Sequence, residues 1–530
     1  MTCTTLVFQV VPRTPQANLS DMPRLVNGGQ GNHFQGTSNG IWSVALKGER
    51  KVDLKISKEW CTFQLNRDAP FIIPKFIPAF MEIGRERELG WCNPHLNKHQ
   101  KAAVWHILQG LARPSPYIIF GPPGTGKTVT VVEAIIQLHC GLPFSRILVT
   151  TPSNSSADLI VERLAKSGAC HPGEMVRLSA FQRDPALISS IVKPFSRSAD
   201  DLARVVRSRI IVTTCASSGL LYSQEIRRGH FTHVIIDEAG QAMEPEALIP
   251  IGLVSPENGQ IILAGDPLQL GPVLTSSYAK TYGLGLSLLE RLCARVPYSR
   301  NEIRFQDHGS YDPLLVTKLV KNYRSHDAIL NFYSSAFYAG ELEVEADRNI
   351  RESLCHLPFL PCPGIPIIFH GVHGENLQEE ASPSWFNPAE VFQVIRYLQK
   401  LDQSGLCEND VGVVTPYRKQ VEKIRSLMKR FGLPPYKVGS VEEFQGQERK
   451  AIIISTVRSC EEFLPFDLSH NMGFLFSKKR FNVAISRAKA LLIVIGDPWL
   501  LSTDNYWRQL LDKCIHLGVY CGCTFNLPSP

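Results

Sequence analysis

The sequence predicts an α/β protein made of two tandem units, each with a parallel sheet. From about residue 83 onward, short apolar runs rich in Ile and Val alternate with stretches of helical periodicity. This alternation is typical of buried strands in an open parallel sheet. It stops over the polar segment Ser299–Tyr311 and then resumes. We therefore expect a linker at that segment and a second unit beyond it.

The first unit contains a series of strand-like apolar runs. They lie at Tyr117–Phe120, Arg146–Thr150, Ile210–Thr213, His233–Ile236 and Gln260–Ala264. The segment Ser155–Arg207 is long for a single crossover between two parallel strands. We therefore expect a mainly helical insertion at about 155–207 in this unit.

The second unit repeats the pattern. Its strand-like runs lie at Ile365–His370, Asp410–Val414, Ala451–Thr456 and Leu491–Gly496. The predicted organisation is an N-terminal segment at 1–82, a first domain at 83–305 and a second domain at 306–530.

The N-terminal segment lacks the alternation. Asn27–Gly40 is rich in Gly, Asn, Gln and Ser, as loops are, whereas Val44–Leu46 and Val52–Ile56 alternate like short strands. The segment is therefore either the remnant of a small β-domain or an irregular stretch. The apolar patch Leu6–Val11 has no basic segment before it, so we expect no secretory signal.

The composition excludes several classes of protein. Hydrophobic residues make up 44% and charged residues 20% of the 530, which is typical of globular domains and not of collagen or coiled coils. No apolar run approaches the roughly 18–20 residues that span a bilayer. The net charge of +7 fits a polyanionic partner and an ordinary basic enzyme equally well. The 14 cysteines form no CxxC pair, which favours a reducing cytosolic or nuclear compartment.

A phosphate-binding loop follows the first predicted strand. It reads GPPGTGKT and precedes a predicted helix at Val129–His139, which is the context that the P-loop motif requires. Its glycines allow backbone N–H groups to surround phosphate oxygens. Lys127 would reach the β- and γ-phosphates, and Thr128 would bind Mg²⁺. The candidate nucleotide-binding residues here are Gly121, Pro122, Pro123, Gly124, Thr125, Gly126, Lys127 and Thr128.

An acidic pair follows the strand-like run that ends at Ile236. Asp237 and Glu238 begin the sequence DEAGQ. A carboxylate at the end of a buried strand beside a P-loop suits Mg²⁺ coordination, which we assign to Asp237. Glu238 would orient and deprotonate the attacking water.

The second unit supplies two arginine-containing segments, NYRSH at 322–326 and RFNVAISRAK at 480–489. Phosphoryl transfer needs positive charge at the γ-phosphate, which often comes from an arginine of a second unit. Apolar residues interrupt the charges of RFNVAISRAK, so part of it is buried. A buried arginine needs an anion.

Taken together, these motifs resemble superfamily 1 RNA helicases of the up-frameshift type, within them the Moloney-leukaemia-virus-10 and Armitage branch. The resemblance covers about Leu96 to Gly522. In the family's order, the segments that carry it are LNKHQ at 96–100, GPPGTGKT, TPSN at 151–154, DEAGQ, GDPLQLGP at 265–272, NYRSH, TPYR at 415–418, GSVEEFQGQE at 439–448 and RFNVAISRAK.

The resemblance implies two RecA-like domains with ATP and Mg²⁺ between them. It assigns the adenine edge to Gln100, stacking on the adenine ring to Tyr323 and the ribose to Glu448.

The resemblance also implies the groups around the γ-phosphate. Gln269 would sense this phosphate, and Arg324 and Arg487 would stabilise its charge in the transition state. Lys127, Asp237 and Glu238 keep the catalytic roles given above.

Nucleic acid is expected on the opposite face of both domains. Hydroxyls, amides and backbone N–H groups near strand ends contact phosphates without reading bases, so binding should tolerate any sequence and depend on salt. The residues that the resemblance assigns are Ser153, Asn154, Thr213, Thr214, Thr415, Pro416, Tyr417 and Ser440.

The implied function is an ATP-dependent RNA helicase. It would move 5′ to 3′ along single-stranded RNA, and would unwind duplexes or remodel ribonucleoproteins in RNA silencing or RNA decay. Two alternatives stay open: a DNA-directed helicase, and an ATP-gated RNA-binding scaffold that does not unwind. The intact candidate catalytic residues argue against an inactive scaffold.

The resemblance also sets expectations for partners and place. We expect single-stranded RNA, or a duplex with a single-stranded tail, together with Argonaute-type silencing or RNA-decay proteins and no membrane. The expected location is the cytoplasm, including ribonucleoprotein granules. The regulatory region typical of this branch is missing or reduced to residues 1–95, as in a short isoform or an incomplete gene model.

Overall fold

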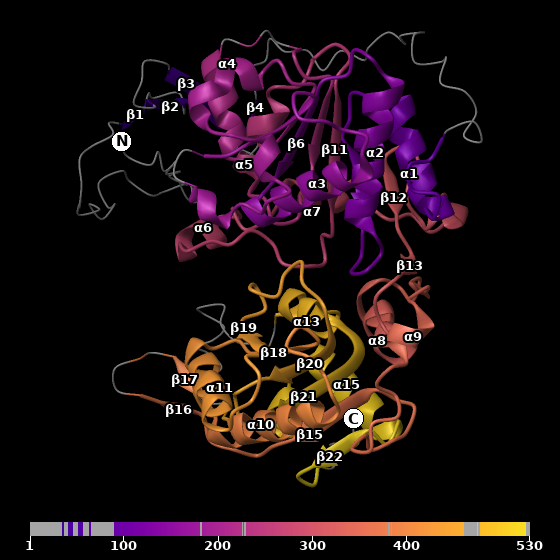
Figure 1. The fold of residues 1–530 in the computed structure, drawn as a ribbon, viewed down its shortest axis with the longest axis vertical. Coiled ribbons are helices and arrows are strands. Elements are labelled where there is room, and N and C mark those ends of the chain that lie inside the picture. Colours follow the sequence, from indigo (N-terminus) through magenta and orange to yellow (C-terminus); the bar gives the residue numbers. More distant parts are fainter. Residues whose placement is uncertain are drawn as a thin grey trace, which may run out of the picture. The chain divides into compact units, whose positions relative to one another are not determined.

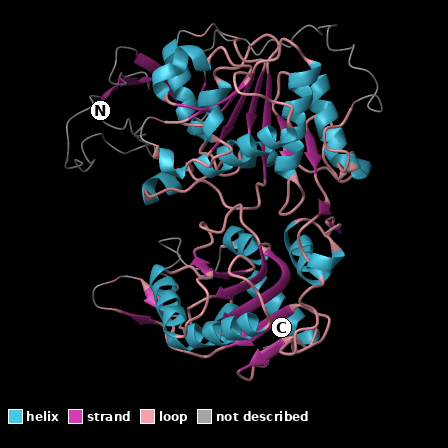
Figure 2. Ribbon diagram, viewed as in Figure 1, coloured by secondary structure: helices cyan, strands magenta, loops and turns pink. Residues whose placement is uncertain are grey.

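The computed structural model describes residues 90–525, except 181–182, 225, 227–228, 380–381, 383, 461–473 and 475–476, together with four short strands between residues 34 and 64. Figures 1 and 2 show that helices and strands alternate along most of the described chain. No helix among the described residues is long and apolar enough to cross a membrane.

The first domain is built on an eight-stranded sheet with the strand order β12-β5-β11-β10-β6-β9-β7-β8. All of its strand pairs are parallel. The predicted strands of this unit are confirmed, since each overlaps an observed one. The strands are β5 (Tyr117–Phe120), β6 (Ile147–Thr151), β7 (Met175–Leu178), β8 (Ser196–Arg197), β9 (Ile210–Thr214), β10 (His233–Ile236), β11 (Gln260–Gly265) and β12 (Val316–Lys318).

Successive residues of the central strands face two different cores. Ile119 packs with the helices α1 (Lys98–Gln109), α2 (Lys127–Gly141) and α3 (Asn154–Ser167). Its neighbour Ile118 packs into the core on the other face of the sheet. Burial on both faces explains why these strands are continuous apolar runs. The remaining helices before β12 are α4 (Leu202–Val205), α5 (Glu244–Ile251), α6 (Ser277–Thr281) and α7 (Leu288–Cys293).

The second domain has a six-stranded parallel sheet with the order β19-β18-β20-β21-β15-β22. All four strands predicted for this unit are confirmed. The elements are α8 (Asp327–Phe337), α9 (Arg348–Arg351), β15 (Ile367–Gly371), α10 (Pro388–Gln403), β18 (Val411–Val414), α11 (Arg418–Arg430), β19 (Lys437–Gly439), β20 (Arg449–Ser455), α13 (Lys478–Ile485), β21 (Ala488–Gly496), α14 (Pro498–Leu501), α15 (Asn505–His516) and β22 (Tyr520–Gly522). Two small ribbons accompany it: β13 (Lys321–Asn322) with β14 (Glu343–Val344), and β16 (Leu377–Gln378) with β17 (Trp385–Phe386).

The structure adds detail at two of the predicted boundaries. The segment expected as a mainly helical insertion, 155–207, holds α3, α4 and three short 3-10 helices, together with β7 and β8, which extend the sheet. The predicted border at 305/306 precedes β12, which pairs with β5 inside the first sheet. β12 is a three-residue strand with a lysine at its end, too short for its alternation to be recognised.

The N-terminal strands form a separate antiparallel sheet in the order β1-β2-β3-β4. They are β1 (Phe34–Gly36), β2 (Ile41–Ala45), β3 (Lys51–Ile56) and β4 (Phe63–Gln64). The strand expected at Val52–Ile56 is β3, and the one expected at Val44–Leu46 overlaps the end of β2. The patch Leu6–Val11 and most of the loop at Asn27–Gly40 lie outside the described residues.

Candidate nucleotide and nucleic-acid sites

The phosphate-binding loop connects β5 to α2. Gly124 and Gly126 have φ angles of 73° and 80°, which disfavour residues with a Cβ. A Cβ would also lie 2.6 Å from the Arg324 Cβ at position 124, and 2.4 Å from the Gln100 Nε2 at position 126. No side chain caps α2, so the N–H groups of its first turn are free for an anion. The loop therefore fits a nucleotide phosphate.

Four side chains of the predicted site lie together at this loop. The Lys127 Nζ is 2.9 Å from Glu238 Oε1 and 3.7 Å from Asp237 Oδ1. The Thr128 hydroxyl donates to Asp237 Oδ2 at 3.2 Å. β10 is paired in parallel with β6 and β11, which brings Asp237 to the edge of the sheet where the loop lies. Thr128 and Asp237 already supply oxygen ligands of the kind that Mg²⁺ takes beside a phosphate.

The charges of this cluster stabilise one another. Burial alone would lower the pKa of Lys127, but Glu238 and Asp237 outweigh it, so that this pKa is raised. Burial alone would raise the pKa of Glu238, but Lys127 and more distant Arg487 hold it below its ordinary value. For Asp237 burial dominates and raises the pKa. Glu238 is therefore the carboxylate of the pair that most readily stays ionised.

Glu238 has an unusual backbone. Its φ is 55°, in the left-handed region that few residues with a Cβ adopt. Its Oε2 accepts a hydrogen bond from Gln241 Nε2 at 2.9 Å. Such conformations persist where the surroundings fix them, and they gather at active sites. The turn and Gln241 together hold the carboxylate that we expect to act on water.

Gln269 and Arg487 meet although they come from different domains. The Arg487 Nη2 donates to Gln269 Oε1 at 2.7 Å, and the Gln269 Nε2 donates to Asp266 Oδ2 at 2.7 Å. Arg487 also donates to the carbonyls of Val483 and Gln447. Within the part of the chain that the structure describes, it forms no ion pair, although only 3% of it is exposed. Burial, and then Arg324, lower its pKa to about 10, so it is charged at neutral pH and suited to an anionic ligand.

Arg324 is held by Glu448. The Arg324 Nε donates to Glu448 Oε2 at 2.6 Å, and the Lys489 Nζ lies 3.0 Å from Glu448 Oε1. Burial would raise the pKa of Glu448, but Arg324 and Lys489 lower it to about 2. Glu448 is thus ionised and fixes both cations. The sequence motifs did not predict this pairing.

Gln100 and Tyr323 lie on either side of Asn97. Gln100 Oε1 accepts from the Asn97 N–H at 3.0 Å in a capping box, and its Nε2 donates to the Thr125 carbonyl at 3.3 Å. The Asn97 Nδ2 donates to the Tyr323 hydroxyl at 2.9 Å. Tyr323 is 40% exposed, which leaves ring surface for stacking. Each end of the Gln100 amide makes one of these hydrogen bonds, which leaves one N–H and one oxygen lone pair for a base edge.

The expected nucleic-acid residues gather at two sheet edges. Strands β6 and β9 are neighbours, and Asn154 and Thr214 lie at or just past their ends. Strands β18 and β19 are also neighbours, and Thr415 and Ser440 follow them. Since carboxyl ends of parallel strands share one edge, each group is contiguous.

Two of these residues have hydroxyls that are bonded within the fold. The Thr213 hydroxyl is buried and donates to the Leu178 carbonyl at 3.0 Å. The Tyr417 hydroxyl is buried and accepts from Arg458 Nε at 2.8 Å. Their side chains serve the fold, so phosphate contacts at these positions would fall to the backbone. The exposed Asn154 and the half-buried Ser153, Pro416 and Ser440 stay accessible, whereas Thr214 and Thr415 are buried.

Sequence reasoning assigned no role to Asp266, Tyr338 or Asn482. All three are buried next to Gln269 and Arg487. Asp266 and Asn482 lie inside quoted motifs, so their positions gave a signal. Tyr338 lies outside every motif and only the folded structure reveals it.

Known protein families match both α/β domains of the chain. Two family models, each described as an AAA domain, match residues 285–498 and residues 95–205 with 196–277. The RNA helicase Mov10l1 of Homo sapiens is 55% identical over 442 residues, and that of Mus musculus 54% over 446. The two matches cover 83% and 84% of this chain, and 36% and 38% of the length of the human and mouse proteins. The protein named "Probable RNA helicase armi" of Drosophila melanogaster is 42% identical over 477 residues, covering 84% of this chain and 40% of its own.

The matched region is therefore a pair of AAA domains on parallel α/β sheets, of the superfamily 1 type. The chain is a homologue of the proteins named RNA helicase Mov10l1 and "Probable RNA helicase armi" over the matched region. The family uses a nucleotide and a metal. The chain spans 36% to 40% of the length of these relatives.

Proposed function

We propose that this chain hydrolyses ATP to move along single-stranded RNA, 5′ to 3′, and thereby unwinds duplexes or remodels ribonucleoproteins. The observation that carries the proposal is the hydrogen bond from Arg487 to Gln269. It joins a buried cation of the second domain to the nucleotide site of the first, beside Lys127 and Glu238.

The residues divide the chemistry between them. The loop Gly121–Thr128 would hold the ATP phosphates, and Thr128 with Asp237 would hold Mg²⁺, which supplies charge neutralisation. Glu238 would accept the proton of the attacking water. Arg324 and Arg487 would stabilise the charge on the γ-phosphate in the transition state.

Hydrolysis would be coupled to movement through the same residues. With the γ-phosphate in place, Arg487 and Gln269 share an anion that draws the domains together. Its loss removes that shared partner. The two sheet edges that carry Asn154 and Ser440 would then grip the strand in alternation.

The domain organisation is also part of the proposal. We place the N-terminal segment at 1–82, the first domain from 83 to about 318, and the second domain from there to 530. The border between the two domains is moved from 305/306 so that the first domain includes β12, which pairs with β5. The proposed protein partners are silencing proteins of the Argonaute type or RNA-decay proteins. The cytoplasm, including ribonucleoprotein granules, is the proposed location.

The decisive experiment is steady-state ATPase without nucleic acid, with single-stranded RNA and with matched single-stranded DNA. Glu238→Gln serves as the blank. It should lose at least about 100-fold in turnover, the scale of a lost general base. Because this change also frees Lys127 from its carboxylate, ATP affinity should be kept or increased.

Each outcome selects one reading. Stimulation by RNA alone supports the RNA helicase, and unwinding of a duplex with a 5′ tail then tests the direction. Equal stimulation by DNA supports a DNA-directed helicase. RNA binding without turnover under any condition supports the scaffold.

A further inference from the structure

Tyr338 joins two segments of the nucleotide site through one hydroxyl group. It follows α8 directly and is 1% exposed. Its hydroxyl donates to Asp266 Oδ2 at 2.7 Å and accepts from Asn482 Nδ2 at 2.7 Å. Asp266 follows strand β11 of the first sheet, and Asn482 belongs to helix α13 of the second domain. The tyrosine therefore lies where the two domains meet.

The same two segments carry the sensor and the arginine. The Asp266 Oδ2 that accepts from Tyr338 also accepts from Gln269 Nε2 at 2.7 Å. This bond fixes which end of the Gln269 amide points away, so its Oε1 faces Arg487 at 2.7 Å. Tyr338 is thus separated from Arg487 only by Asp266 and Gln269.

A second connection closes the network. The Asn482 Nδ2 donates to the Leu268 carbonyl at 3.0 Å as well as to the Tyr338 hydroxyl. Leu268 directly precedes Gln269, and Asn482 lies on the helix that leads to Arg487. Both routes from Tyr338 therefore end at the Gln269–Arg487 bond. The hydrogen bonds of the network thus fix the positions of these two side chains together.

The ring of Tyr338 is held independently of its hydroxyl. The Lys318 Nζ donates to the Tyr338 carbonyl at 3.1 Å, and the Lys318 Nζ also pairs with Glu341 at 2.6 Å. The ring packs against Phe120 and Tyr333 at centroid distances of 6.3 and 6.5 Å. Removing the hydroxyl alone should therefore leave the ring in place.

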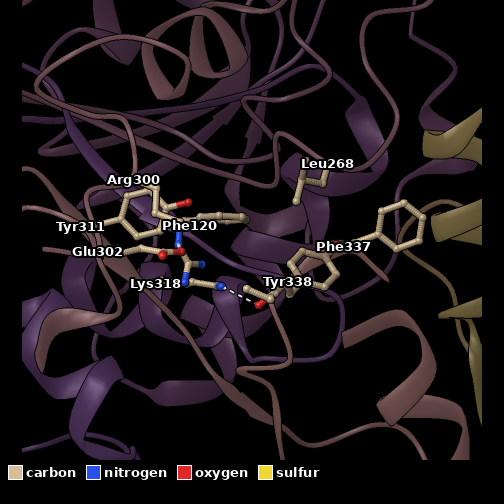
Figure 3. Close-up of a pocket in the computed structure, with 9 residues that line it drawn as sticks. Phe120, Leu268, Arg300, Glu302, Tyr311, Lys318, Phe337 and Tyr338 are labelled. Carbon is tan, nitrogen blue, oxygen red and sulfur yellow. Dashed lines mark hydrogen bonds and ion pairs between the residues drawn. The ribbon is translucent and has the colours of Figure 1, made fainter. Parts of the chain in front are cut away.

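A cavity of about 300 Å³ borders this network. Figure 3 shows Leu268, Tyr338 and Lys318 around it, with the contact between Lys318 and Tyr338 drawn as a dashed line. Burial, and then Asp266, raise the pKa of Tyr338 well above its ordinary value, so its hydroxyl keeps the proton that it donates.

We propose that Tyr338 is a positioning residue that sets Gln269 and Arg487 for the transition state by binding Asp266 and Asn482 with one hydroxyl. This inference rests on the proposed function and adds a residue outside the helicase motifs. The Tyr338 hydroxyl bonds to Asp266 and Asn482 and would act through them. Its effect should therefore appear in transition-state stabilisation and leave ground-state nucleotide binding unchanged.

The test is Tyr338→Phe, with Tyr436→Phe as a matched control. Tyr436 is also buried, and its hydroxyl lies within hydrogen-bonding distance of two acceptors, Asp402 Oδ1 at 3.2 Å and the Leu406 carbonyl at 3.3 Å. For Tyr338→Phe we expect kcat to fall about tenfold and KM for ATP to stay within about twofold, as for a lost hydrogen bond to a charged group. Tyr436→Phe should change neither. A fall in ATP affinity with kcat unchanged would overturn the proposal.

A binding measurement separates this proposal from the ATPase proposal. Calorimetry would compare ADP with ADP plus aluminium fluoride, a transition-state analogue. Tyr338→Phe should weaken the analogue about tenfold and leave ADP unchanged. If the wild-type chain binds both and does not turn over, the proposed function fails while the ratio still decides the role of Tyr338. An unchanged ratio would overturn that role.

A double-mutant cycle tests the route. In a Gln269→Ala background, Tyr338→Phe should cost little further in analogue affinity, since the residue through which it acts is gone. Additive losses would mean that Tyr338 acts on its own, against the proposal.

Discussion

The Nη2 of Arg487 donates to the Oε1 of Gln269 at 2.7 Å. This bond links the end of helix α13 in the second domain to the loop after strand β11 in the first. Arg487 is buried, its hydrogen bonds go to neutral acceptors, and among the described residues it forms no ion pair. A transferring phosphoryl group is an anion of the right kind.

Replacing Arg487 by alanine should therefore impair turnover more than binding. We expect kcat to fall at least about 100-fold, because the charge on the γ-phosphate is greatest in the transition state. The KM for ATP should change no more than about threefold. Steady-state kinetics with RNA present measures both. Arg430→Ala, at an exposed arginine of α11, is the control. If the variant instead lost affinity for ATP while kcat stayed unchanged, Arg487 would be a residue that binds ATP in the ground state.

Gly124→Ala should abolish nucleotide binding and lower stability. The new Cβ would lie 2.6 Å from the Arg324 Cβ and 2.7 Å from the Asn322 Nδ2, at a φ of 73°. Gly168→Ala is a matched control, since it has a φ of 72° with nothing within 4 Å. Both variants carry the backbone strain of about 1–2 kcal/mol. The extra loss in melting temperature at position 124 therefore measures the clash, and equal losses at both positions would disprove it.

Glu390 should make the stability of the protein depend on pH. This carboxyl is fully buried and accepts from Ser455 Oγ at 2.6 Å and from the Val457 N–H at 2.8 Å. Burial raises its pKa from 4.5 to about 8. Since the folded state prefers the protonated form, its stabilising contribution is full below about pH 4.5 and is lost as pH rises through 8.

The measurement is the melting temperature of Glu390→Gln relative to the wild type from pH 5 to 8.5. The neutral amide cannot ionise, so the variant should gain on the wild type as pH rises. A difference that stays constant across this range would show that Glu390 does not titrate there.

Asn154→Ala should weaken RNA binding, whereas Thr213→Val should not. Asn154 is exposed at an edge of the first sheet, and Thr213 is buried with its hydroxyl bonded to Leu178. We expect a loss of about three- to tenfold in affinity for Asn154→Ala, the scale of one hydrogen bond, and only a lower melting temperature for Thr213→Val. Fluorescence anisotropy with labelled RNA measures the affinity. A weaker complex with Thr213→Val would restore Thr213 to the interface.

The sequence was sufficient to predict the sheets and the phosphate loop. Central strands such as β5 and β10 are continuous apolar runs, because both of their faces are buried, and their predicted bounds match the structure. β7, β8, β12, β19 and β22 were missed, because strands of two to four residues at or near a sheet edge carry little periodicity.

The residues of the candidate site that lie within sequence motifs could be predicted from the sequence. Lys127, Thr128, Asp237 and Glu238 come together as their spacing implied. Burial of a side chain at a strand end could not be predicted, since Thr213 looks the same in sequence whether its hydroxyl faces solvent or a neighbouring strand. Pairings between distant segments, such as Tyr338 with Asp266, leave no local pattern at all.

At position 238, the residue that would best suit the left-handed backbone differs from the residue that the proposed catalysis needs. With a φ of 55°, the backbone there suits asparagine or glycine better than glutamate. In a library of variants selected only for heat resistance, this glutamate should therefore be replaced. The selected variants should have higher melting temperatures and should bind ATP without hydrolysing it. The residue with the strained backbone at this turn is the one on which the proposed ATPase depends.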